Sequence, residues 1–299
     1  MQPTENQAEP IRAKTTAGSH GEPRNASSTG QEATDATWLA GHFESFRPEY
    51  ERCVQMVDLE AGWHVLDAGC GSGSFLPLLA EAIGAEGRLS AIDLAPDNVE
   101  VVQRRLASWN LPCPVEIQQA SILSLPFEDD SFDAVWIANV IMYLNDSELQ
   151  QALSELRRVV CAGGLICFKE GDLRLPNFYP IPCSYYAPMV TAMGALFPGA
   201  DHARMLPFHL RDCGIDVMKQ QTVVIERWSP LSAADRAFYS SFLSTVAGAA
   251  AHVELPEAAR AFWRAQQDPT SPESFVNQPD IAIVAGQIVV VGRVPGIEE

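Results

Sequence analysis

The sequence predicts an α/β protein built on a mostly parallel sheet with helices on both faces. Two observations carry this prediction. Short apolar runs typical of buried strands alternate with runs of helical periodicity between residues 63 and 169. A turn rich in glycine, with Gly69, Gly71 and Gly73, joins the first of these strands to the helix that follows it. Strict alternation of strand and helix favours parallel strands connected by crossover helices.

The elements of the first half are predicted from their apolar spacing. A helix is expected at 48–59, before the first strand. Five strands are expected at 63–67, 88–93, 114–119, 132–138 and 164–169, and helices between them at 73–83, 96–108 and 146–160. The last of these helices has a clear start signal, because Asn145 can cap it and Glu148 stands three residues further on.

The pattern changes after residue 169. The segment 172–212 is rich in Pro, Tyr, Phe and Met, and it shows no clean periodicity before a short helix near 203–213. Further strands are expected near 215–226 and 286–293, with helices between them at 231–251 and 256–266. We interpret residues 37–299 as one domain in which 172–212 is an insertion.

The glycine turn indicates a ligand site. Without side chains, a ligand can lie against the backbone close to the amide groups at the helix start. The third glycine comes one residue early for a dinucleotide-binding loop, in which Ser74 would be glycine. Asp67, two residues before Gly69, would repel a pyrophosphate and suits a cation. A nucleotide-dependent oxidoreductase is therefore disfavoured, although it stays an alternative.

The residues from Val65 to Gly73 resemble the first motif of the class I S-adenosylmethionine (SAM)-dependent methyltransferases. The similarity continues through 90–93, 126–135 and 158–166, in the family's order. This resemblance implies a Rossmann-like sheet of seven strands whose last strand is antiparallel. It also implies SAM as the cofactor and methyl transfer to a small molecule as the activity.

The resemblance assigns the cofactor contacts residue by residue. Asp93 would accept the ribose hydroxyls, Asp67 would hold the methionine ammonium, and Gly69, Gly71 and Gly73 would let SAM approach. Leu94 would pack on adenine, with Ser121 and Ile122 on its other side, and the backbone carbonyl of Asn139 would contact the methionine end. Ser121 departs from the acid that is commoner in the family, which predicts a weaker contact to the adenine amino group.

Composition narrows the range of partners. The formal net charge is −18 and no basic run offsets it, so we expect no binding to nucleic acid or to anionic membranes. The seven cysteines show no spacing typical of a zinc site, which predicts reduced thiols, no metal and a cytoplasmic protein. Residues 1–36 are polar and lack aromatics, which predicts a disordered tail without signal-peptide character.

The expected reaction is methyl transfer to a small, largely apolar organic acceptor at O, N or C. We expect the insertion to roof the acceptor pocket, with Tyr185 or Tyr186 touching the acceptor. His209 and Tyr143 are the candidate proton acceptors. The alternative is a SAM-binding protein without methyl transfer, either a non-methylating catalyst such as a cyclase or a regulatory subunit. The acceptor and the oligomeric state are left open by the sequence.

Overall fold

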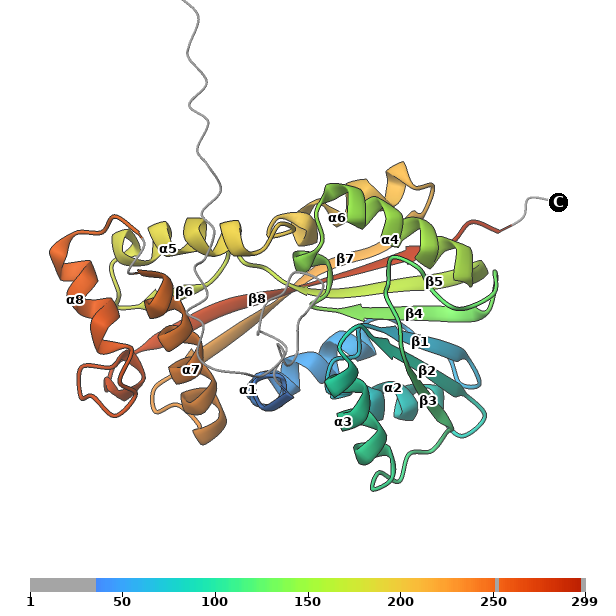
Figure 1. Ribbon diagram of the computed structural model, residues 1–299, viewed down its shortest axis with the longest axis horizontal. Helices are drawn as coiled ribbons and strands as arrows, with labels where there is room; N and C mark the ends of the chain where they lie inside the picture. Colours follow the sequence, from blue (N-terminus) through green and yellow to red (C-terminus); the bar gives the residue numbers. More distant parts are fainter. Residues whose placement is uncertain (1–35, 251–252, 297–299) are drawn as a thin grey trace, which may run out of the picture.

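A computed structural model describes residues 36–250 and 253–296 of the chain. The predicted polar tail, 1–36, lies outside the described residues except for Ala36. The described part is an α/β fold around one twisted sheet, as predicted, and its strands run in the order β3-β2-β1-β4-β5-β8-β6, with β7 paired to β8 (Figure 1).

The strands agree with the predicted ones except for a short additional strand, β6. They are β1 (His64–Ala68), β2 (Arg88–Asp93), β3 (Val115–Gln119), β4 (Phe132–Ala138), β5 (Val160–Gly171), β6 (Asn177–Tyr179), β7 (Asp216–Trp228) and β8 (Ala282–Arg293). Strands β1 to β5 are parallel, whereas β8 pairs antiparallel with β5, β6 and β7. The carboxyl ends of the parallel strands therefore meet at one edge of the sheet.

Eight α-helices and two short 3-10 helices occur in the described part of the chain. They are α1 (Ala36–Gln55), α2 (Leu76–Ile83), α3 (Pro96–Leu106), η1 (Ile141–Tyr143), α4 (Asp146–Val159), α5 (Cys183–Leu196), α6 (His202–Asp212), α7 (Ala233–Ala250), α8 (Glu257–Ala265) and η2 (Phe275–Asn277). Helices α4 and α6 cover one face of the sheet, and α1, α2 and α3 lie against the other (Figure 1).

Helix α1 begins earlier than the sequence predicts. It starts at Ala36 and continues through Pro48, where the sequence analysis placed the helix start. A proline inside a helix removes one backbone hydrogen bond. Burial of Phe43, Phe46 and Tyr50, each no more than 5% exposed, outweighs this loss. Helix α1 therefore presents an aromatic face to the sheet edge rather than acting as a short lead-in.

The insertion contains more regular structure than the sequence predicts. Besides α6, close to the predicted helix, the segment 172–212 holds β6 and the helix α5. Pro188 lies inside α5, and the helix lacks a polar face that would mark it as amphipathic. For these two reasons the sequence of α5 shows no amphipathic periodicity from which the helix could be predicted.

The start of α4 offers a test of the fold. Asn145 Oδ1 accepts a hydrogen bond of 3.0 Å from the amide of Glu148, and Glu148 Oε2 accepts one of 2.9 Å from the amide of Asn145. Asn145→Ala should lower the free energy of unfolding by about 1 kcal/mol, because both bonds of this capping box depend on the cap geometry. Chemical denaturation measures the change. Ser154→Ala, at an exposed position of the same helix beyond the cap, serves as the control. Equal losses in the two variants would contradict the cap's role.

Candidate functional site

A cavity of about 740 Å³ opens at the carboxyl edge of the parallel strands. Its walls come from the segments that follow β1, β2, β3, β4 and β5, together with residues of α1 and α7. In open α/β sheets this edge is where ligands bind, and the volume suits a small organic ligand. The cavity is therefore the candidate site.

The glycine turn forms one wall and tolerates no side chains. Gly69 has φ +87°, and a Cβ there would lie 2.5 Å from Cγ2 of Val140. Gly71 has φ +54° and Gly73 has φ +79°, which other residues rarely adopt. Gly69 and Gly71 line the cavity, whereas Gly73 packs against Val102 beneath it. The third glycine thus serves packing of the helix on the sheet rather than direct ligand contact.

Asp93 ties the glycine turn to the start of α3. Its Oδ2 accepts from the Gly71 amide at 2.7 Å, and its Oδ1 accepts from the Ala95 amide at 2.9 Å and from Asn98 Nδ2 at 3.1 Å. Burial raises the pKa of Asp93, while these three hydrogen bonds act against that shift. Because each carboxylate oxygen has two lone pairs, Oδ2 can accept one further donor from a ligand, and Oδ1 is already fully used.

Asp67 is a buried carboxylate that faces the cavity without a full set of partners. It is 1% exposed, and no hydrogen-bond donor reaches its Oδ2 within the described residues. Burial, and secondarily the nearby Asp93 carboxylate, raises the pKa of Asp67 to about 8. A buried carboxylate in this state is stabilised by a cationic donor. The site is therefore suited to a ligand that brings a positive charge to Asp67.

Two charged residues at the end of β5 hold the loop after β4. Lys169 is fully buried, and its Nζ donates to Oδ1 of Asn139 at 2.8 Å and lies 3.8 Å from the ring centre of Tyr50. Glu170 Oε1 accepts from the amides of Val140 at 2.9 Å and Ile141 at 3.3 Å. Burial lowers the pKa of Lys169 to about 7 and raises that of Glu170 to about 7. These contacts hold Asn139 in its left-handed conformation, with φ +58°.

The other predicted cofactor contacts also line the cavity. They are Leu94, Ser121, Ile122 and Asn139. Leu94 is 38% exposed, as an apolar side chain on an open wall would be. The Ser121 hydroxyl accepts a hydrogen bond of 3.2 Å from the Leu123 amide, so its capacity as an acceptor for a ligand is partly used.

The two candidate proton acceptors are separated by the fold. Tyr143 lines the cavity, and burial raises its pKa to about 12, so its phenol is neutral near pH 7. His209 does not line the cavity; it lies on α6, with Nδ1 3.4 Å from Gln150 Nε2 on α4. Helix α6 packs on the face of the sheet that α4 covers, which carries His209 away from the site.

The insertion lines the cavity with residues other than the expected tyrosines. Neither Tyr185 nor Tyr186 lines the cavity. Tyr185 packs on Phe262 of α8 at a centroid distance of 6.0 Å. Tyr186 packs between Phe178, at 5.0 Å, and Trp263 of α8, at 6.3 Å. The insertion contributes Leu173, Pro176, Phe178 and Phe197 to the lining. The segment therefore reaches the cavity, whereas the two tyrosines expected to touch the acceptor do not line it.

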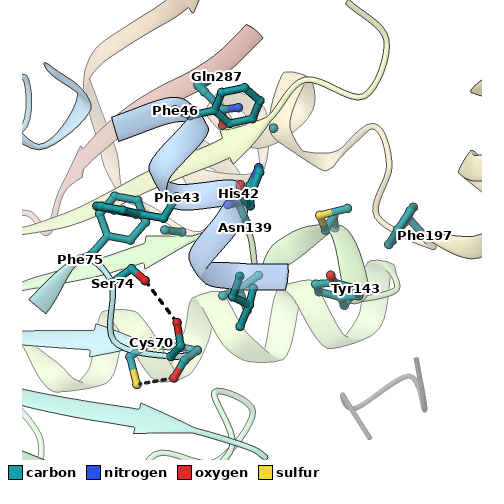
Figure 2. Close-up of a pocket in the computed structure, with 18 of the residues that line it drawn as sticks. His42, Phe43, Phe46, Cys70, Ser74, Phe75, Asn139, Tyr143, Phe197 and Gln287 are labelled. Carbon is teal, nitrogen blue, oxygen red and sulfur yellow. Dashed lines mark hydrogen bonds between the residues drawn. The ribbon is translucent and has the colours of Figure 1, made fainter. Parts of the chain in front are cut away.

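Helix α1 supplies site residues that the sequence analysis missed. His42, Phe43, Phe46 and Tyr50 all line the cavity. His42 Nε2 lies 3.0 Å from the Tyr50 hydroxyl, and His42 is drawn with Asn139 among the lining residues in Figure 2. Burial lowers the pKa of His42 to about 3, with the positive charge of Lys169 acting in the same direction. His42, Phe46 and Tyr50 are spaced i, i+4 and i+8, which places them on one face of a helix. This spacing could have revealed the site residues if the predicted helix had been extended to positions before Pro48.

The described part of the chain contains neither a cluster of side chains suited to a metal ion nor a helix suited to cross a membrane. No cluster of three or more His, Cys, Asp or Glu side chains is arranged to hold a metal ion within 36–250 and 253–296. None of the helices in those ranges is both long and apolar enough to cross a membrane.

Comparison with known proteins finds similarity to methyltransferases over part of the chain. Residues 65–164 match the methyltransferase-domain family. A demethylmenaquinone methyltransferase of Staphylococcus aureus is 30% identical over 156 residues, which are 52% of this chain and 63% of the relative. The chain thus spans less than two thirds of the length of that curated relative.

Two solved structures share the fold. The YcgJ protein of Bacillus subtilis is 15% identical with a TM-score of 0.50, over 83% of this chain and all of that one. The [4+2]-cyclase SpnF is 19% identical with a TM-score of 0.50, over 85% of this chain and 83% of that one. At these identities the likeness concerns the fold alone.

Asp67 gives the site a testable pH dependence. Its pKa of about 8 in the folded protein exceeds the ordinary value of 3.8, so the folded state holds the extra proton between about pH 4 and 8. The free energy of unfolding should therefore fall as the pH rises through this window. Asp67→Asn should reduce the fall between pH 5 and pH 8 by at least about 1 kcal/mol.

Denaturant titrations at the two pH values, without added ligand, measure this difference. Glu170 adds a fall of the same sign up to about pH 7, but it is present in both proteins and cancels in the comparison. Asp280→Asn, which alters an exposed carboxylate, is the matched control. Identical pH profiles for the wild type and Asp67→Asn would contradict the buried, high-pKa state of Asp67.

Proposed function

We propose, from the premise that residues 65–164 form a class I SAM-dependent methyltransferase domain, that the protein transfers the SAM methyl group to a small, largely apolar organic acceptor. The observation that carries the proposal is the buried, incompletely paired Asp67 beside the glycine turn. The ammonium of the SAM methionine would supply the missing charge and donor.

The other parts of SAM would contact further residues that line the cavity. Asp93 would accept one ribose hydroxyl at the free lone pair of Oδ2, since its other accepting positions are used within the protein. Leu94, Ser121 and Ile122 would flank the adenine. The carbonyl of Asn139 would contact the methionine end from the loop that Lys169 and Glu170 hold.

Methyl transfer from SAM depends more on the orientation of the acceptor relative to the methyl group than on acid or base catalysis by the protein. SAM supplies an electrophilic methyl on its sulfonium; as the acceptor atom bonds to this carbon, the carbon–sulfur electron pair returns to sulfur. The protein's part is to hold the acceptor in line and to keep water out. The apolar side chains of α1 and α7 around the cavity, among them Phe43, Phe46 and Phe242, suit that task.

A proton must leave when the acceptor is a hydroxyl or an amine. We propose His42 as its acceptor, because it is neutral near pH 7 and lies in the cavity wall, unlike His209. Its low pKa is no obstacle for a hydroxyl acceptor, because a methylated oxygen that still carries its proton is a very strong acid. The Tyr50 hydroxyl at 3.0 Å would orient the imidazole ring.

The test of the function is formation of S-adenosylhomocysteine (SAH). The acceptor panel includes demethylmenaquinone, since the Staphylococcus relative is named for it, and simpler ring-bearing alcohols and amines. SAM binding with acceptor-dependent SAH formation is the expected result. SAM binding without SAH formed on any acceptor would favour the alternative of a SAM-binding protein without methyl transfer, and absence of SAM binding would overturn both.

Asp93 should be essential for cofactor affinity. Asp93→Ala is expected to weaken SAM binding by roughly 30- to 1000-fold, because it removes the charge-assisted hydrogen bond to the ribose and also the contacts that hold the Gly71 amide and the start of α3. Isothermal titration calorimetry measures the dissociation constant. Glu100→Ala, on the exposed side of α3, should leave the constant unchanged. An unchanged constant for a folded Asp93→Ala protein would refute the assignment.

His42 and His209 form a matched pair for the proton transfer. His42→Asn should lower turnover on the order of 100-fold with a hydroxyl acceptor and leave SAM affinity within a few fold. His209→Asn should change neither quantity, since His209 lies outside the cavity. SAH release measured over a pH series gives both rates. Loss of turnover in His209→Asn instead would return the role to the histidine predicted from the sequence.

A further inference from the structure

The cavity continues beyond the proposed cofactor site into a chamber of aromatic rings. We call this part the aromatic chamber and define it by five side chains, which are Phe46, Phe178, Phe238, Tyr239 and Phe242. Phe178 and Phe242 stack at 6.1 Å with 19° between their planes, and Phe238 and Phe242 stack at 6.1 Å with 28°. Flat walls of this kind favour a ligand that contains a ring.

Two residues that line the cavity each carry a buried polar atom without a hydrogen-bond partner among the described residues. Tyr239 is 2% exposed and Gln287 is 4% exposed, and both line the cavity. Within the described residues, neither the Tyr239 hydroxyl nor Oε1 of Gln287 makes a hydrogen bond. A buried polar group without a partner destabilises the protein, because it has lost its hydrogen bonds to water. A ligand that satisfies both atoms removes this destabilisation, and one that satisfies neither does not.

The pair defines the ligand's polar group by its donor and acceptor pattern. The Tyr239 hydroxyl can donate, and Oε1 of Gln287 can only accept. A hydroxyl group on the ligand can accept from the first and donate to the second. A methyl ether cannot donate to Gln287, and an ammonium group leaves the hydrogen of Tyr239 without an acceptor.

Charge excludes anionic ligands from the aromatic chamber. No lysine or arginine stands among the described residues that line the cavity, and three aspartates do, which are Asp67, Asp93 and Asp172. The nearby Arg227 is fully engaged by Glu49 and Asp235, at 2.8 and 2.9 Å. A carboxylate or phosphate in the chamber would be buried without a counter-charge. A cationic ligand would add a second positive charge to a cavity proposed to hold a sulfonium.

We propose that the aromatic chamber binds an uncharged, ring-bearing alcohol or phenol, whose hydroxyl accepts from Tyr239 and donates to Oε1 of Gln287. The proposal rests on the proposed function in one respect, since it makes this ligand the methyl acceptor. Binding itself depends only on the chamber. The two can therefore be tested separately.

The probe is naphthol, compared with naphthoate, methoxynaphthalene and aminomethylnaphthalene. Each is titrated by calorimetry into the full chain, with and without saturating SAH. Naphthol should bind at least about 5-fold more tightly than each of the other three, which corresponds to one net hydrogen bond. Tightest binding by the cationic or the anionic analogue would overturn the proposal, as would equal binding by the methyl ether.

The variants assign the effect to the two polar atoms. Tyr239→Phe and Gln287→Met should each weaken naphthol binding about 5- to 10-fold and leave methoxynaphthalene and SAH binding within about 2-fold. Tyr185→Phe and Gln221→Met, at positions outside the cavity lining, are the matched controls and should change nothing. Thermal melts verify that all four variants are folded. Unchanged naphthol binding in both folded test variants would refute the proposal.

The same titrations distinguish this inference from the proposed function. Selective naphthol binding without any binding of SAH would leave the chamber assignment standing and overturn the methyltransferase proposal. SAH binding without selectivity for naphthol would do the reverse.

Discussion

The site depends on the burial of charge at the carboxyl edge of the sheet. Asp67, Lys169 and Glu170 all lie at the ends of strands with no more than 1% of their surface exposed. Burying charged groups without complete pairing destabilises a protein. The cost is partly offset by the loop amides that Glu170 accepts from and by the Tyr50 ring beneath the Lys169 ammonium. At Asp67, no hydrogen-bond donor among the described residues reaches Oδ2, which leaves a position that a cationic ligand can stabilise.

The sequence could place most of the residues proposed to bind the cofactor at one cavity, because the signals for them are local. The acids Asp67 and Asp93 each end a strand, and Gly69 and Gly71 form the turn between a strand and its helix. Parallel strands bring such ends together without any knowledge of distant packing. The sequence-based role of Gly73 was less accurate, because its contact with Val102 depends on how α2 and α3 pack.

The part of the cavity proposed to bind the acceptor could not be predicted in the same way. His42 and Phe46 on α1 meet Phe238 on α7 at centroid distances of 5.0 Å, across nearly two hundred residues of sequence. No local pattern encodes that meeting. The choice of His209 failed for a related reason: proximity in sequence to the insertion did not reveal that α6 packs on the opposite face of the sheet. Helix periodicity correctly indicated which side chains are buried, but it could not indicate which of the buried side chains line a cavity.

Asn139 connects the two halves of the site. Its amide donates to the Lys169 carbonyl at 2.9 Å, and its Oδ1 accepts from the Lys169 ammonium. That ammonium lies on the ring of Tyr50, whose hydroxyl is 3.0 Å from His42 Nε2. A continuous series of contacts thus joins the loop proposed to hold the methionine end to the histidine proposed to take the proton. Burial, and secondarily the positive charge of Lys169, keeps His42 neutral. The residue that holds the loop after β4 therefore also helps to keep the proposed proton acceptor in its unprotonated form.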